Sequence, residues 1–156
     1  MSAIRSSLQT VTEWLRFHNN PNLASLEGLE NLTYVGELMS ISGTELLENV
    51  DELGALTTVE GDLYIHHNDA LVGVDGLGNL VAVEDLHIAD NQALVSISGL
   101  SSLTTVSDTS FYIVGNPLLP DCDVCGVFGQ LTTTPSFVSI YDNLDDSCTP
   151  APDNCL

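Results

Sequence analysis

Lysine is absent from the sequence and arginine occurs only twice, whereas 22 residues are acidic and the formal net charge is −20. A protein this acidic repels the phosphates of nucleic acids and the surface of anionic membranes, so neither is an expected partner. Cationic partners, bound divalent ions such as calcium and a saline environment agree better with the charge. The simplest interpretation is that the acidic residues keep the protein soluble, and we expect no cofactor.

Long hydrophobic runs are missing too, since no stretch reaches the roughly 20 apolar residues that a membrane-spanning helix needs. The first five residues, MSAIR, do not resemble a signal peptide, which indicates a mature form or a domain taken from a longer chain. The sequence has no glycine-rich phosphate loop, no HExxH motif and no motif that places a nucleophile. We therefore expect neither membrane insertion nor enzyme activity.

Cysteine is confined to the last quarter of the chain, at Cys122, Cys125, Cys148 and Cys155. The CxxC spacing of the first two would also suit zinc or redox chemistry. Zinc needs four converging ligands, however, and a thioredoxin-like site needs a βαβ context that is absent here. Four cysteines beside a proline-rich end favour two disulfides formed in an oxidising compartment, which predicts a secreted or cell-surface protein.

The most informative feature that is present is a repeat of about 24 residues. Its clearest unit is residues 56–79, and the same slots recur in 8–31, in 32–55, from 80 after a one-residue deletion, from 103, and in degenerate form from 131. Seven slots of the clearest unit are apolar: Leu56, Val59, Leu63, Ile65, Leu71, Val74 and Leu77. A unit this short cannot bury its own apolar face, so the units must stack and share one core.

Alternation within each unit, as in Leu63 and Ile65, predicts a short strand with both apolar side chains pointing inward. Stacked about 4.8 Å apart, these strands would form one parallel sheet along the molecule. The predicted fold class is therefore all-β, a coil of about six turns with one parallel sheet face. We expect one domain over residues 1–148, with 1–7 as a cap or remnant and 149–156 as a proline-rich tail.

A row of polar residues occupies one slot after the strand. The asparagines of this row are Asn20, Asn68, Asn91, Asn116 and Asn143, and Thr44 takes the same slot in the second unit. These amides could bind a ligand or form a structural ladder. We favour the ladder, because the bends of a stacked coil bury backbone groups that need hydrogen-bonding partners.

The run V-x-G-D-L-x-I-x-x-N-x-x-L-x-x-V-x-G-L, at residues 59–77, resembles the receptor L domain. This leucine-rich solenoid occurs in insulin- and EGF-type receptors, fungal wall proteins and many bacterial surface proteins. The resemblance covers about residues 8–148, and it implies a right-handed coil of five to six turns with an extracellular recognition role. The chain lacks the cysteine-rich neighbour and the N-terminal capping helix of the receptors, so hormone binding does not carry over.

The end of the repeat region reads N-P-x-L-P-x-C from Asn116 to Cys122, and this ending is similar to that of bacterial members. The similarity implies that Cys122 pairs with Cys148 and closes the last turn. Cys125 is then left to pair with Cys155.

The outward side of the predicted sheet carries most of the candidate binding residues. Alternation places these residues there or just before the strand: Trp14, Arg16, His18, Tyr64, His66, His87, Tyr112 and Tyr141. Exposed aromatic side chains on a flat sheet indicate a binding surface, because they bury a large area at low entropic cost. Ordinary cross-strand packing between residues that favour strands would place them equally well.

The histidines of this surface raise the question of a metal. His66 and His87 would lie on neighbouring strands at a diagonal of roughly 7 Å, close enough to share zinc or copper if a carboxylate joined them. Asp62 and Asp85 lie one slot further back, however, and surface histidines that bind nothing are far commoner. We therefore assign no metal site.

The function that these patterns favour is a non-catalytic extracellular recognition or adhesion module, which binds a protein or glycan partner through the sheet face. A structural subunit that self-assembles end to end is the alternative. Its basis is the missing N-terminal cap, because the bare end of a coil exposes apolar slots and unpaired strand edges.

Overall fold

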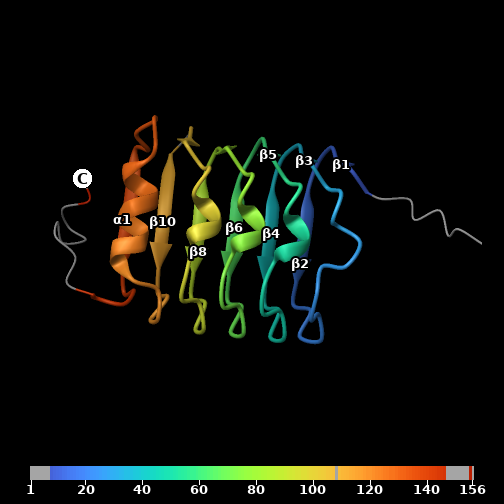
Figure 1. The fold of residues 1–156 in the computed structure, drawn as a ribbon, viewed down its shortest axis with the longest axis horizontal. Coiled ribbons are helices and arrows are strands. Elements are labelled where there is room, and N and C mark those ends of the chain that lie inside the picture. The colour runs from blue at the N-terminus through green and yellow to red at the C-terminus, as the bar shows by residue number, and fades with distance from the viewer. Residues whose placement is uncertain (1–7, 108, 147–154, 156) are drawn as a thin grey trace, which may run out of the picture.

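Short parallel strands recur at the repeat spacing in the computed structural model, which describes residues 8–107, 109–146 and 155 (Figure 1). They form two sheets, and all pairings between strands are parallel. The larger sheet contains β2 (Leu15–His18), β4 (Met39–Ser42), β6 (Leu63–His66), β8 (Leu86–Ala89), β10 (Ser110–Val114) and β11 (Phe137–Tyr141), in the spatial order β11-β10-β8-β6-β4-β2.

The smaller sheet was not predicted from the sequence. It contains β1 (Thr10–Val11), β3 (Tyr34–Val35), β5 (Thr58–Val59), β7 (Ala82–Val83) and β9 (Thr105–Val106). Two residues are too few to show an alternating pattern, so the sequence reveals each of these strands only as a single recurring apolar position. The prediction of a single sheet was therefore wrong.

The register of the larger sheet joins equivalent slots of successive repeat units. Met39 lies opposite Leu63, and Leu63 lies opposite Leu86, so the one-residue deletion before β8 is absorbed outside the strands. Inward residues consequently stack on inward residues along the whole sheet. This stacking is the physical reason why the apolar slots keep their spacing through the repeat.

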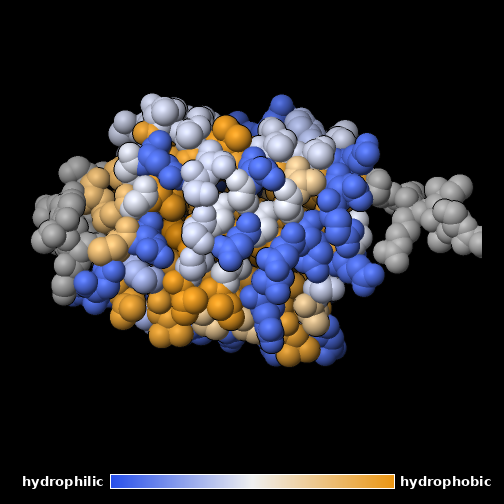
Figure 2. All heavy atoms as spheres, in the orientation of Figure 1, coloured by the Kyte–Doolittle hydropathy of each residue, from blue (hydrophilic) through white to orange (hydrophobic). Residues whose placement is uncertain are grey.

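The core lies between the sheets and the remaining walls of the units. On the face shown in Figure 2, hydrophilic residues gather mainly over the N-terminal half of the stack, and hydrophobic residues gather along the lower edge. All seven apolar slots of the second unit have no exposed surface: Leu32, Val35, Met39, Ile41, Leu47, Val50 and Leu53. Burial of each such side chain contributes about 1.5–3 kcal/mol, which the loss of chain entropy largely offsets. In the first unit Leu26 is buried and Leu8 is exposed, whereas the other five slots are only partly buried: Val11, Leu15, Phe17, Leu23 and Leu29.

Three 3₁₀ helices form a row beside the sheets, one in each of three successive units (Figure 1). They are η1 (Asp51–Leu53), η2 (Asp75–Leu77) and η3 (Ser98–Leu100). The units approach closely here, because a Cβ atom on Gly76 or on Gly99 would overlap the carbonyl oxygen of the preceding unit. Glycine is the one residue that permits this separation.

The helix α1 (Asp121–Gly129) continues this row in the next unit, so the all-β prediction is incomplete (Figure 1). It buries Val124 and Val127, and the ring of Phe128 meets that of Phe111 edge to face at a centroid distance of 5.3 Å. The three apolar residues do have helical spacing. Over a nine-residue helix, however, that pattern is too short to distinguish from a loop closed by cysteines.

Cys125, in α1, forms a disulfide with Cys155, which is the pairing that the resemblance implied. The other expected pairing includes Cys148, which lies outside the described residues. The same holds for residues 1–7 and for the tail 149–156 apart from Cys155. No helix in the described part of the chain is long and apolar enough to cross a membrane.

Candidate functional site

The outward side of the larger sheet, which we call the sheet face, consists of two parallel rows. The first row is Arg16, Ser40, Tyr64, His87, Tyr112 and Ser139, and the second is His18, Ser42, His66, Ala89, Val114 and Tyr141. The register aligns these positions across the strands, and four of them are buried: Ser40, Ser42, Ala89 and Val114. Trp14 precedes β2 at one margin of the face and has 57% of its surface exposed.

Exposure varies along the sheet face, which is recessed at β4, the strand next to the edge strand β2. Ser40 and Ser42 on β4 are buried, with 1% and 7% of their surfaces exposed, and the Oγ atom of Ser40 lies 2.8 Å from His18 Nε2. Trp14 and Tyr141 lie at opposite ends and are both more than half exposed. The face is thus ridged by large side chains on both sides of two small ones.

Four aromatic rings on adjacent strands form a ladder that consists of Tyr64, His87, Tyr112 and Tyr141. The ring of His87 lies 4.6 Å from that of Tyr64 and 5.1 Å from that of Tyr112, with interplanar angles of 39° and 27°. Tyr141 meets Tyr112 nearly perpendicularly at 6.4 Å, and their hydroxyl oxygens lie 3.3 Å apart. Because each ring supports the next, the ladder is already ordered without a partner.

Burial and nearby carboxylates control the ionisation of the ladder. Burial is the main cause that raises the pKa of Tyr64 to about 12, and the negative charge of Asp62 adds to it. Burial lowers the pKa of His87, although Asp85 and Asp62 oppose that shift. Both rings are therefore uncharged at neutral pH, and the charge around them is negative.

Asp85 is occupied structurally. Its Oδ1 atom accepts the backbone N–H groups of Thr109, at 2.9 Å, and Ser110, at 2.7 Å. These bonds hold the entry to β10 against β8. The carboxylate that lies beside His87 is thereby committed to strand positioning rather than to acid–base chemistry.

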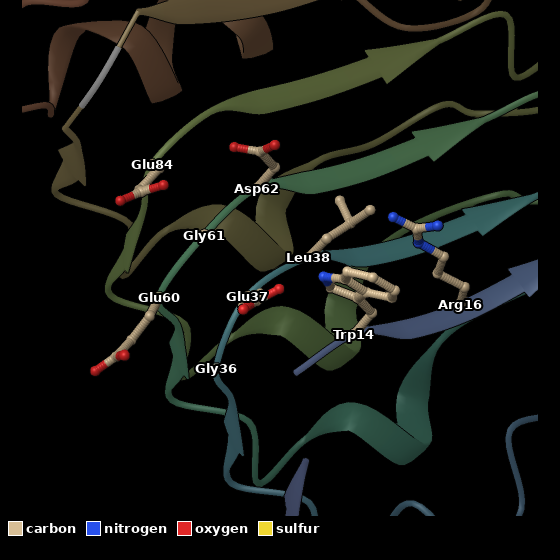
Figure 3. A pocket seen from close by; sticks show the side chains of 9 residues that line it. All are labelled: Trp14, Arg16, Gly36, Glu37, Leu38, Glu60, Gly61, Asp62 and Glu84. Carbon is tan, nitrogen blue, oxygen red and sulfur yellow. The ribbon is translucent and has the colours of Figure 1, made fainter. Parts of the chain in front are cut away.

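An open groove of about 660 Å³ adjoins the sheet face at its N-terminal margin (Figure 3). The guanidinium of Arg16 lies 4.7 Å from the ring centre of Trp14, and four carboxylates line the groove beside them: Glu37, Glu60, Asp62 and Glu84. Sequence reasoning missed this groove. The available signal was the recurrence of acidic residues soon after one apolar slot: Glu37 follows Val35 by two residues, and Glu60 and Glu84 directly follow Val59 and Val83.

His66 and His87 do lie at diagonal positions on the neighbouring strands β6 and β8, but their side chains make different contacts. His87 packs between two tyrosines, whereas His66 contacts His67, with 3.0 Å between their Nδ1 atoms. On its other side, His67 Nε2 lies 3.7 Å from Asp90 Oδ2. Burial lowers the pKa of His66, and the neighbouring His67, His18 and His87 add to this effect. Within the described residues, no group of three or more His, Cys, Asp or Glu side chains could hold a metal ion.

The asparagine row forms a hydrogen-bonded ladder inside the molecule. Asn68 Nδ2 donates to Ile41 O at 3.0 Å and to Asn91 Oδ1 at 3.2 Å, and Asn91 repeats both bonds one unit further on. Asn116 donates in the same way to Ile88 O and to Asn143, while Asn20 at the first unit is exposed and donates to His18 O. Because Asn68, Asn91 and Asn116 have no exposed surface, they are not available to a ligand.

Comparison of the chain with protein-family models, with curated proteins and with solved structures gives no match. The interpretation of the site consequently depends on the geometry of its own residues.

Proposed function

We propose that the chain is a right-handed leucine-rich solenoid of about six turns, similar to the receptor L domain. The register of the larger sheet supports this proposal, because it joins each unit to the next at equivalent slots. The row formed by η1, η2, η3 and α1 supports it too, since one helical segment accompanies each of four successive units.

We further propose that the protein is a non-catalytic extracellular recognition or adhesion module that binds a protein or glycan through the sheet face. The observation that carries this proposal is the ladder of Tyr64, His87, Tyr112 and Tyr141. Such a row presents a wide apolar surface with polar edges, and a partner that covers it loses little entropy in ordering it. The Cys125–Cys155 disulfide supports an oxidising, extracellular location.

The negative charge near the ladder indicates which classes of partner the sheet face can bind. Asp62 and Asp85 lie near Tyr64 and His87, and further carboxylates line the groove at the N-terminal margin of the face. The two arginines are the only permanently cationic side chains in the sequence. A polyanionic partner is disfavoured by this field, whereas neutral glycans and basic protein segments are favoured. The hydroxyl groups of a neutral sugar would find acceptors in these carboxylates, and its apolar face would lie against the rings.

The test is a binding screen on immobilised neutral glycans and basic peptides with the oxidised protein. The double variant Tyr64→Ser/Tyr112→Ser should lose the binding that the wild type shows, because it removes two rungs of the ladder. Val95→Ser is the matched control, since Val95 is 44% exposed but lies away from the sheet face. Equal binding by wild type and the tyrosine variant, with both folded by circular dichroism, would rule out the ladder as the contact surface.

End-to-end self-assembly is the second candidate. The observation that favours it is the partial burial of Val11, Leu15 and Phe17, whose counterparts Val35, Met39 and Ile41 are fully buried. Light scattering at rising concentration would reveal assembly, and Leu8→Glu should disperse it because Leu8 lies at the same end and is 40% exposed. A constant monomer mass would contradict this candidate and leave the recognition proposal in place.

A further inference from the structure

One backbone position in every unit adopts a left-handed conformation directly after the strand of the larger sheet. The φ angles there range from 53° to 68°, and the residues are Asn19, Gly43, His67, Asp90, Gly115 and Asp142. Five of the six are glycine, asparagine or aspartate, the residues that most readily accept this conformation. His67 is the exception.

The stacking of the units, and not the residue type, imposes this conformation. The N–H group of His67 donates to Ala89 O at 3.1 Å, and its carbonyl accepts the N–H of Gly43 at 3.1 Å. The equivalent N–H of Asp90 donates to Val114 O in the same way. Histidine, like asparagine and aspartate, is enriched in this conformation, so the backbone permits His67, and its side-chain contacts are a separate observation.

The two imidazoles of His66 and His67 meet through the same nitrogen type. Their Nδ1 atoms lie 3.0 Å apart, and the ring planes are almost perpendicular at 82°. Two nitrogens that each lie about 2.0 Å from one ion and about 3.0 Å from each other subtend an angle of roughly 95°. This value is near the right angle between adjacent ligands in square-planar Cu(II), whereas tetrahedral Zn²⁺ needs about 3.3 Å between the nitrogens.

Asp90 supplies the outer contact that metal-bound histidines usually have. Its Oδ2 atom lies 3.7 Å from Nε2 of His67, the ring nitrogen that faces away from His66. At 3.7 Å this contact is electrostatic and longer than a hydrogen bond, and a carboxylate on that side favours the tautomer that carries the proton on Nε2, which leaves the Nδ1 lone pair for a metal. The Asp90 carboxylate, the His67 imidazole and the His66 imidazole thus follow one another in this order, and the metal position lies between the two imidazoles.

We propose that His66 and His67 bind one Cu(II) ion through their Nδ1 atoms, with Asp90 orienting His67. The described residues add no third protein ligand of the His, Cys, Asp or Glu type, so water or a donor from a partner completes the coordination. The site lies at the edge of the sheet face, because His66 ends β6 in its second outward row. The proposal is independent of the function of the aromatic ladder.

The experiment is a titration of the oxidised, metal-free protein with Cu(II), followed by calorimetry and electron paramagnetic resonance in a non-chelating buffer. The wild type should bind one equivalent and give an axial spectrum with coupling to imidazole nitrogen. His66→Gln and His67→Asn should each weaken binding by at least about tenfold, and Asp90→Asn should weaken it less. In His67→Asn, asparagine occupies the slot that Asn19 occupies in the first unit, so the metal-free variant should melt no lower than the wild type.

His18→Gln and His87→Gln are the matched controls, because they remove the other two histidines and should leave copper binding unchanged. Stoichiometric binding that survives in the double variant His66→Gln/His67→Asn would assign the copper to carboxylates and overturn the proposal. Absence of binding by the wild type, together with a lower melting temperature of metal-free His67→Asn, would show that the Nδ1 contact is only a structural hydrogen bond.

Discussion

Asn91 Nδ2 donates to Oδ1 of Asn116 at 3.1 Å, and the same oxygen accepts the backbone N–H of Asn91 at 3.1 Å. One amide oxygen therefore serves both the side chain and the backbone of the preceding unit. Since both residues are fully buried, water cannot replace these bonds, and each unit depends on its successor to satisfy the bend after the strand.

Replacement of Asn91 by alanine should destabilise the protein by about 3 kcal/mol, because it leaves the backbone N–H of Asn68 and the carbonyl of Ile65 buried without these partners. Urea denaturation measures the loss. Asn20→Ala is the matched control, since Asn20 is exposed and its side-chain amide donates to His18 O outside the buried ladder, and its cost should stay below about 1 kcal/mol. Equal losses in the two variants would show that burial of the ladder is not what makes it important.

Gly99→Ala should be strongly destabilising, by about 3 kcal/mol or more, because the added Cβ would overlap the carbonyl of Val74 in the adjacent unit. Thermal unfolding would report it as a lower melting temperature. Gly126→Ala should instead stabilise the protein by about 0.5–1 kcal/mol, since Gly126 lies within α1 and its Cβ would meet no atom within 4 Å. A similar response of both variants would contradict the close approach of the units.

Acidification should weaken the protein through His87. Burial lowers its folded-state pKa below the ordinary value of 6.5, while Asp85 and Asp62 partly oppose the shift and His66 is the nearby cation-forming group. The contribution of the neutral ring is therefore complete above pH 6.5 and is lost as pH falls from 6.5 through the folded-state pKa. The difference in stability between the wild type and His87→Gln, measured by urea denaturation, should shift against the wild type between pH 7.5 and pH 5. A difference that is constant over this range would refute the shifted pKa.

Loss of the disulfide between Cys125 and Cys155, 30 residues apart in the sequence, should reduce stability by about 3 kcal/mol. The variant Cys125→Ser/Cys155→Ser isolates this bond without chemical reduction of other cysteines. Because the bond attaches α1 to the end of the chain, hydrogen exchange should accelerate in α1 and remain slow in β6. Uniform acceleration through both elements would show instead that the disulfide stabilises the fold globally.

The residues of the sheet face can be predicted from the sequence, but the contacts between their side chains cannot. The outward positions of Tyr64, His87 and Tyr112 follow from alternation, and their alignment follows from the repeat. That His87 lies between the two tyrosines, and that His66 turns toward His67 instead, depends on side-chain rotamers. Rotamers respond to neighbours from other units, and no local pattern encodes them.

The sequence by itself determined the repeat length, the inward apolar slots, the register of the larger sheet and the position of the asparagine row. These features follow from the repeat spacing, which recurs in each unit because only one spacing lets all units bury the same slots. The tertiary structure alone decided the second sheet, the helix α1, the groove beside Trp14 and the pairing of His66 with His67. The second sheet and the groove arise from contacts between units, α1 from an apolar pattern too short to identify, and the pairing of His66 with His67 from the left-handed backbone at position 67 together with the side-chain rotamers. Periodicity along the chain encodes none of these geometries.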